Sequence, residues 1–153
     1  MTKFGKLLFA LILITILAVI IFFLQRPSVL VTDIPMENNM QSEIIGNKSD
    51  LISFSILPNT KVHGVLSYRG AIKGGYFFEG NILINILDLN KEILKASNAT
   101  ATADWMTSEP VDFEGNIDFT ELPKGPVYIE IHNDNASGLP ENDKFVLIPV
   151  LIE

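Results

Sequence analysis

The residues best suited to binding a ligand lie between positions 134 and 143, in the sequence DNASGLPEND. Their side chains offer three carboxylates and two amide oxygens, from Asp134, Glu141, Asp143, Asn135 and Asn142. Calcium takes six to eight oxygen ligands, so this set of donors is large enough for a calcium site. The spacing differs from the twelve-residue calcium loop, which has a glycine at its sixth position. Calcium binding is therefore one of three interpretations of this segment.

The second interpretation of residues 134–143 is a structured connection between two strands. Asn135 and Asn142 are suited to Asx turns, Gly138 to a left-handed backbone, and Pro140 to a fixed exit from the loop. The third interpretation is direct contact of the same loop with a partner molecule. The structural interpretation is favoured, because it requires no ligand.

Catalytic patterns are missing from the sequence. The two histidines, His63 and His132, are the only side chains whose ordinary pKa suits a general base near neutral pH, and neither lies in a G-x-S-x-G or H-E-x-x-H context. The segment GAIKGG at 70–75 lacks the Lys-Ser/Thr ending of a phosphate-binding loop. The pair Asp112 and Glu114 is of a kind expected by chance in an acidic chain. We expect no enzyme activity, no catalytic residues and no cofactor.

Trp105 is the only tryptophan and follows a run of small residues. Its indole is predicted to pack against them with its N–H bonded to one partner; the alternative is an exposed aromatic anchor for a protein or a sugar. Glu79 lies between Phe78 and Gly80 on a predicted half-buried strand, where a structural hydrogen bond is the favoured role.

Composition and charge exclude several classes of protein. The chain has 153 residues, 48% of them hydrophobic, and a formal charge of −7. From Pro27 onward it carries 8 basic and 18 acidic residues, which argues against a nucleic-acid partner, since such binding needs clustered Lys and Arg. The lack of cysteine excludes a disulfide framework, a thiolate zinc site and a cysteine-linked lipid anchor.

The amino-terminal segment predicts a membrane anchor. Residues 7–24 are apolar except for Thr15, and as a helix they would rise about 27 Å, close to the ~30 Å hydrocarbon core of a bilayer. Lys3 and Lys6 precede this run, so the carboxyl-terminal part is expected on the extracytoplasmic side of a single-pass cell-membrane protein. A cleaved secretory signal is the alternative, although no small-residue cleavage site follows the run. The predicted organisation is an anchor at 1–26, a flexible linker at 27–49 and one domain at 50–153.

The pattern after Asp50 has a period of two, as in the alternation of apolar and acidic residues over 111–119. Seven strands are predicted, separated by Gly, Pro and Asn turns, at 51–57, 65–72, 76–88, 93–103, 111–119, 126–133 and 144–152. Seven short strands in about 100 residues indicate an all-β immunoglobulin-like sandwich, with a small barrel as the alternative. The last strand is apolar on both faces, and its Pro149 predicts an edge position or a bulge.

Three segments in this domain carry a family resemblance. FFEG at 77–80, DWMT at 104–107 and NASGLPEND at 135–143 resemble, in this order, signature segments of the immunoglobulin-like domain of bacterial spore germination proteins, which is often found beside a GerMN domain. The resemblance covers residues 50–153. Ala136 stands where that family usually has proline, and no GerMN domain fits in this chain. The resemblance implies a bacterial, extracytoplasmic, immunoglobulin-like module without catalytic residues.

The resulting hypothesis is a non-catalytic module, held in the lipid bilayer through residues 7–24, that contacts an envelope protein or a wall polymer. Loops or an exposed strand edge would make the contact. The alternative is a calcium- or glycan-binding module that uses the loop 134–143 and Trp105. A purely structural subunit of an envelope complex is the third possibility.

Overall fold

The structure of the protein is a computed structural model that describes residues 43–153. The predicted anchor at 1–26 and residues 27–42 of the predicted linker lie outside this range. Within it, no helix is long and apolar enough to cross a membrane. The described chain contains two single-turn 3-10 helices, η1 (Lys48–Asp50) and η2 (Pro140–Asn142), and nine strands: β1 (Ile45–Gly46), β2 (Leu51–Phe54), β3 (Lys61–Val62), β4 (Val65–Lys73), β5 (Asn81–Leu87), β6 (Ile93–Ala101), β7 (Pro110–Asp118), β8 (Gly125–His132) and β9 (Phe145–Ile152).

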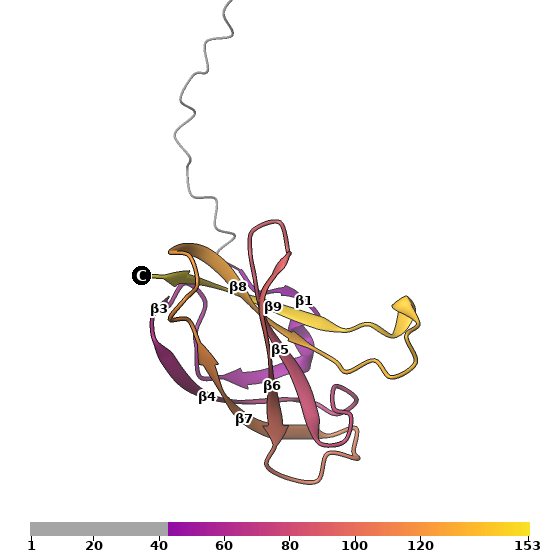
Figure 1. Cartoon of the computed structure of the whole chain (residues 1–153). Coiled ribbons are helices and arrows are strands. Elements are labelled where there is room, and N and C mark those ends of the chain that lie inside the picture. Colours follow the sequence, from indigo (N-terminus) through magenta and orange to yellow (C-terminus); the bar gives the residue numbers. More distant parts are fainter. Residues whose placement is uncertain (1–42) are drawn as a thin grey trace, which may run out of the picture. The chain divides into compact units, whose positions relative to one another are not determined.

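These strands form one curled sheet in the order β1-β9-β8-β5-β6-β7-β4-β2, with β3 paired to β9. The β3–β9 pair is parallel and the other pairs are antiparallel. Figure 1 shows the sheet curling from β9 and β8 through β5 and β6 to β7 and β4. Strand β6 makes the turn of the curl, because it pairs with β5 along most of its length and with β7 only at Thr100 and Ala101.

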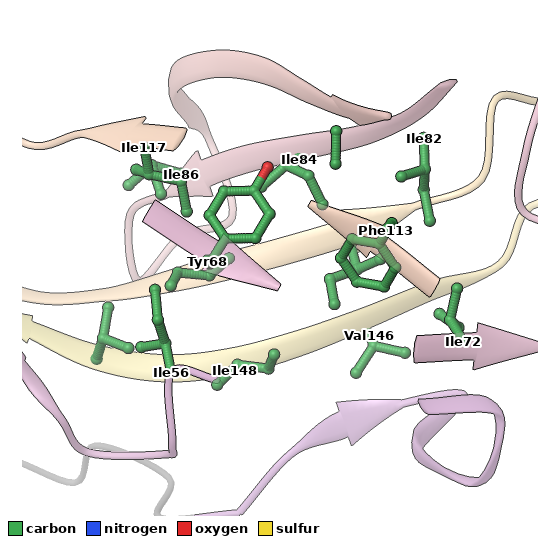
Figure 2. Close-up of a cluster of buried hydrophobic side chains, with 14 of the residues drawn as sticks. Ile56, Tyr68, Ile72, Ile82, Ile84, Ile86, Phe113, Ile117, Val146 and Ile148 are labelled. Atoms are coloured by element: carbon green, nitrogen blue, oxygen red, sulfur yellow. The ribbon is translucent and has the colours of Figure 1, made fainter. Parts of the chain in front are cut away.

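The curl encloses one apolar core, built from the alternating residues that the sequence pattern assigns to a single face. On β7, Val111, Phe113 and Ile117 are each 1% exposed, while the intervening Asp112 and Glu114 are exposed. Figure 2 shows Tyr68 and Phe113 gathered with isoleucines of β5 and β9. The aromatic rings form a cluster within this core, since the Phe113 ring centroid lies 6.2–6.4 Å from those of Phe54, Phe77 and Tyr68.

The all-β prediction is confirmed, and each of the seven predicted strands overlaps a strand of the structure. The predicted number was wrong, because the described residues also contain β1 and β3. Each of these has two residues, which is too short for alternation to be visible in a sequence.

The strand predicted at 76–88 was also too long, since β5 begins at Asn81. Residues 78–81 form a tight turn in which the Phe78 N–H donates to the Asn81 carbonyl and the Asn81 N–H donates to the Phe78 carbonyl, at 3.0 and 2.9 Å. Glu79 and Gly80 occupy the turn with φ of 51° and 77°, which lie outside the β region of regular strands. Glu79 is therefore an exposed turn residue, and its predicted place on a half-buried strand was wrong.

Strand β1 lies inside the segment predicted as linker, so the sheet begins five residues before the predicted boundary at Asp50. Ile45 pairs with Leu147, and the Asn47 N–H donates to the Phe145 carbonyl at 2.8 Å. Gly46, between Ile45 and Asn47 in the chain, has φ of 87°, and a Cβ there would be 2.3 Å from the Phe145 carbonyl oxygen. Glycine is thus required for this close approach of the two backbones.

Pro149 lies where strand β9 changes neighbours. β1 pairs with β9 at Val146 and Leu147, and β3 pairs with it at Leu151 and Ile152, so no strand on this side pairs at Pro149. A residue without an N–H is accommodated in this gap, as expected for proline at the edge of a ladder. Positions 146–150 are all buried, as the apolar character of both faces of this strand indicates.

Candidate functional site

The loop 134–143 is held by hydrogen bonds among its own residues. The Asn135 side chain donates through Nδ2 to the Leu139 carbonyl (2.8 Å) and to Asp143 Oδ1 (2.6 Å), and its Oδ1 accepts from the N–H of Ser137 (3.2 Å). Asn142 Nδ2 donates to Ser137 Oγ at 2.9 Å. Gly138 has φ of 64°, as predicted, and Pro140 begins η2. The loop is therefore a structured connection with an Asx turn at Asn135.

The carboxylates of this loop do not form a metal site with other acidic or histidine side chains. Asp134 is half-buried, Glu141 and Asp143 are exposed, and Asp143 already accepts a bond from Asn135. Nowhere in residues 43–153 do three or more His, Asp or Glu side chains converge in a way that could hold a metal ion. The geometry thus favours a scaffolding role for Asn135, Asn142 and Asp143.

Trp105 packs against the core and is half-buried. Its ring also lies over the turn before β5, because a Cβ added to Gly80 would be 3.6 Å from both Cδ1 and Nε1 of the indole. The Ala101 N–H donates to the Gly80 carbonyl at 2.8 Å, which ties the end of β6 to the same turn. These contacts support the packing interpretation of Trp105 over that of an exposed anchor.

Two of the three segments that carry the family resemblance contact each other, and the residue before the third is bonded next to the first. The turn at 77–80 lies under Trp105, as described above, and the preceding Tyr76 carbonyl accepts from the Asp134 N–H at 3.2 Å. Lys144 Nζ lies 5.8 Å above the centroid of the Tyr76 ring. The Tyr76 hydroxyl donates to Asp50 Oδ2, and burial, then the charge of Asp50 and this hydrogen bond, raise the pKa of the tyrosine. Trp105 and Asp134 are thus parts of a packed end of the domain, whereas Glu141, Asn142 and Asp143 are exposed.

A different surface has the character of a binding site: the outer face of β5, β8 and β9. A hollow of ≈380 Å³ lies on this face. Its lining is mainly aliphatic and aromatic, with four polar side chains among them; we call it the outer apolar face, and its residues are Leu83, Leu87, Ile93, Phe145 and Leu147 with Asn85, Lys91, Glu130 and His132. Leu87 and Leu147 are buried, at 4% and 1% exposed, Leu83 and Phe145 are half-buried, and Ile93 is 60% exposed. Since the outer side of an antiparallel sheet is ordinarily polar, apolar residues there favour a contact surface, with Ile93 as its accessible residue.

One hydrogen-bonded pair crosses the middle of this face. Asn85 is 8% exposed, and its Nδ2 donates to Glu130 Oε2 on the neighbouring strand at 2.8 Å. His132, two residues further along β8, is half-buried, with Nδ1 2.7 Å from the Asn133 carbonyl, so that this nitrogen carries a proton. The buried Asn85 amide is tolerated among aliphatic residues because it bonds to the half-buried carboxylate of Glu130. The pair also provides a directional contact within an otherwise apolar surface.

Sequence reasoning did not select these residues, although a signal was present. β5 reads NILINIL, which has apolar residues at outward as well as inward positions, and β9 reads FVLIPVLI. β9 is apolar throughout and β5 is apolar except at Asn81 and Asn85, a pattern typical of strands that are largely buried on both faces. The missing information was that β8 lies between them and joins Leu83 and Leu87 with Phe145 and Leu147.

Comparisons of the chain with protein-family models, with curated proteins and with solved structures found no match. The candidate site therefore rests on its own geometry.

Proposed function

We propose that this protein is a non-catalytic binding module, anchored in a bacterial cell membrane with its β-domain outside, and that the outer apolar face contacts a protein of the cell envelope. The supporting observation is the hollow over β5, β8 and β9, which combines aliphatic and aromatic lining with the central Asn85–Glu130 bond. Such a combination is typical of a contact surface, where apolar area supplies affinity and a few polar groups fix orientation.

Within the all-β class, we propose that the domain has the immunoglobulin-like sandwich fold. Its constant-type form has strands A, B, E and D in one layer and C, F and G in the other. Of the seven longer strands, β2, β4 and β7 are consecutive in the sheet, like A, B and E, and β5, β8 and β9 are consecutive, like C, F and G. β6, in the place of D, joins the two sets, because it pairs mainly with β5 and with β7 at two positions only. In this assignment the outer apolar face belongs to the C, F and G strands. The resemblance of the three signature segments supports the same assignment, together with a spore-germination-like origin of the domain.

The amino-terminal residues support the membrane location. The 18-residue apolar run at 7–24, with Lys3 and Lys6 before it, has the length and charge of an anchor that leaves the carboxyl-terminal part outside. The 8 basic and 18 acidic residues from Pro27 onward make the external part anionic. A protein partner with an apolar patch and a basic rim would complement it.

Site-specific photo-crosslinking in membranes tests this proposal. A photoreactive phenylalanine analogue is placed at Ile93, which is 60% exposed and lines the hollow, or at Val65, which is 63% exposed and begins β4 in the other part of the sheet. We expect a specific crosslinked protein from position 93 and not from the matched position 65. Ile93→Asp should abolish co-purification of that protein, while Val65→Asp should preserve it. Equal crosslinking from both positions, or unchanged co-purification with Ile93→Asp, would refute the proposed contact surface.

A further inference from the structure

The polar side chains of the outer apolar face are neighbours, with apolar side chains on either side of them. The register of β5, β8 and β9 forms two adjacent rows across the sheet, one of Leu83, His132 and Phe145 and one of Asn85, Glu130 and Leu147. All six residues line the hollow. Glu130 therefore lies on the middle strand, beside Asn85 and two residues from His132, where a partner that covers the apolar residues must also cover the polar ones.

These three polar side chains offer hydrogen-bond acceptors to which the domain itself gives no donor. A carboxylate only accepts, so the Asn85 atom that lies 2.8 Å from Glu130 Oε2 is Nδ2. Asn85 Oδ1 and Glu130 Oε1 then have no hydrogen-bond donor among residues 43–153. His132 donates through Nδ1 to the Asn133 carbonyl, which makes Nε2 of the neutral ring a third acceptor.

The burial of these acceptors determines what a partner must bring. Asn85 is 8% exposed, and Glu130 and His132 are half-buried. Glu130 belongs to none of the three ion pairs within residues 43–153, and Lys91, the one lysine or arginine of the hollow, lies in the exposed turn between β5 and β6. A partner that covers this face removes the remaining water from a carboxylate and an amide oxygen, and it must replace that water with donors for the contact to be favourable.

Building on the proposed function, we propose that the outer apolar face receives an arginine side chain of its protein partner, with the guanidinium on Glu130 and apolar partner residues over Leu83 and Phe145. A guanidinium has five N–H donors in a planar fork, so it pairs with the carboxylate and still donates to a neighbouring acceptor. It is also more weakly hydrated than the ammonium of lysine, which suits a half-buried position. The excess of acidic residues, 18 against 8 basic ones from Pro27 onward, attracts a cationic partner to the same domain.

Titration of the full-length protein in detergent micelles, followed by amide NMR, tests the choice of arginine. The probes are acetyl-Leu-Arg-Leu-amide and the same peptide with citrulline, which has the shape of arginine without its charge. We expect the signals of Asn85, Glu130 and His132 to shift with the arginine peptide, and the citrulline peptide to bind about tenfold more weakly, as is usual when a charge-assisted hydrogen bond is lost. Equal affinity of the two peptides for the wild type would overturn the proposal, and this comparison requires no substitution that could disturb the fold.

A conservative substitution locates the contact. Glu130→Gln keeps an acceptor for Asn85 and removes the charge, so it should weaken binding of the arginine peptide about tenfold. The matched control Glu114→Gln removes an exposed carboxylate of β7 in the other part of the sheet, and it should change binding by less than about twofold. Unchanged binding by Glu130→Gln, or an equal loss with Glu114→Gln, would contradict a specific contact with Glu130.

Crosslinking from position 93 in membranes extends the test to the natural partner. The crosslinked partner peptide, identified by mass spectrometry, should contain an arginine, and Glu130→Gln should lower the crosslink yield while Glu114→Gln preserves it. A specific crosslink to a peptide without arginine would refute the recognised group and leave the contact surface intact. The lack of any specific crosslink would instead refute the contact surface, so the two failures are distinguishable.

Discussion

The sharpest test of the packing concerns Gly115 and Tyr68, which face each other across the β4–β7 ladder. Tyr68 is 3% exposed, and its ring lies over Gly115 so closely that an added Cβ would be 2.4 Å from the hydroxyl oxygen and 2.8 Å from Cζ. Gly115→Ala should therefore displace the tyrosine. Overpacking of this kind lowers the free energy of unfolding by about 1–3 kcal/mol. Replacing a strand glycine by alanine raises it by roughly 0.5–1 kcal/mol, because alanine loses less backbone entropy on folding. We expect a net loss of about 0.5–2 kcal/mol in the free energy of unfolding.

The companion substitution Tyr68→Phe separates the clash from other effects. The hydroxyl donates to the Asn98 carbonyl at 3.5 Å, longer than an ordinary O–H···O bond, so its removal should cost less than about 1 kcal/mol. In the phenylalanine background the closest contact of the added Cβ is lost and the contact with Cζ remains. Gly115→Ala should then be about 1 kcal/mol less destabilising than in the wild type. Urea unfolding of residues 43–153, followed by Trp105 fluorescence, measures the four free energies. Additivity within about 0.5 kcal/mol would refute the proposed contact.

Three further predictions concern hydrogen bonds and ionisation. Asn135→Ala should cost about 1–2 kcal/mol, since it removes the bonds that close the loop 134–143, and limited proteolysis should then cut this loop faster; unchanged cleavage would contradict this. The pKa of Asp118 is held well below its usual range by hydrogen bonds from the Thr120 hydroxyl and N–H, and then by Lys95. The stability that Asp118 contributes is therefore present above the ordinary aspartate pKa near 3.9 and disappears as the pH falls below that value. Asp118→Asn should accordingly flatten the acid decline of the melting temperature, and a parallel decline in both proteins would be the adverse result. Burial, and then the charge and hydrogen bond of Asp50, raise the pKa of Tyr76. The stability that this shift contributes is complete below the ordinary tyrosine pKa of about 10 and is lost as pH rises above it. Absorbance should show Tyr76 ionising at a higher pH in the wild type than in Asp50→Asn, and ionisation at the same pH in both proteins would contradict this.

Alternation was sufficient to predict the long strands and insufficient to predict their ends. The pattern over 111–119 locates β7 because each inward residue is packed in the core and each outward residue is polar. The turn at 78–81 was missed because the aromatic residues before it continue the apolar run of β5, and only the positive φ at Glu79 and Gly80 reveals the break. β1 was missed because its two residues are stabilised by the distant strand β9, a contact that no local pattern records.

The candidate site was less predictable than the fold for a related reason. Functional reasoning from a sequence selects residue types with rich chemistry, and it therefore chose Trp105 and the carboxylates and amides of the loop 134–143. In the structure, Asn135 bonds within the loop and Trp105 packs on the core. The outer apolar face is instead assembled from strands that are distant in the sequence. Leu83 and Phe145 form no motif, since only the order of β5, β8 and β9 in the sheet brings them to one face.

The exposed part of the outer apolar face can vary without loss of the fold, because other residues hold the domain together. The packed end of the domain is stabilised by contacts that do not involve this face: the Gly80 turn under Trp105, the Tyr76 carbonyl with Asp134, and the bonds of Asn135. Ile93 makes no comparable contribution, since it is 60% exposed. Substitution of Ile93 should alter binding while leaving stability within about 0.5 kcal/mol of the wild type. A change at Gly80 or Asn135 should have the opposite effect, and this contrast distinguishes the residues that hold the domain together from those that we propose bind its partners.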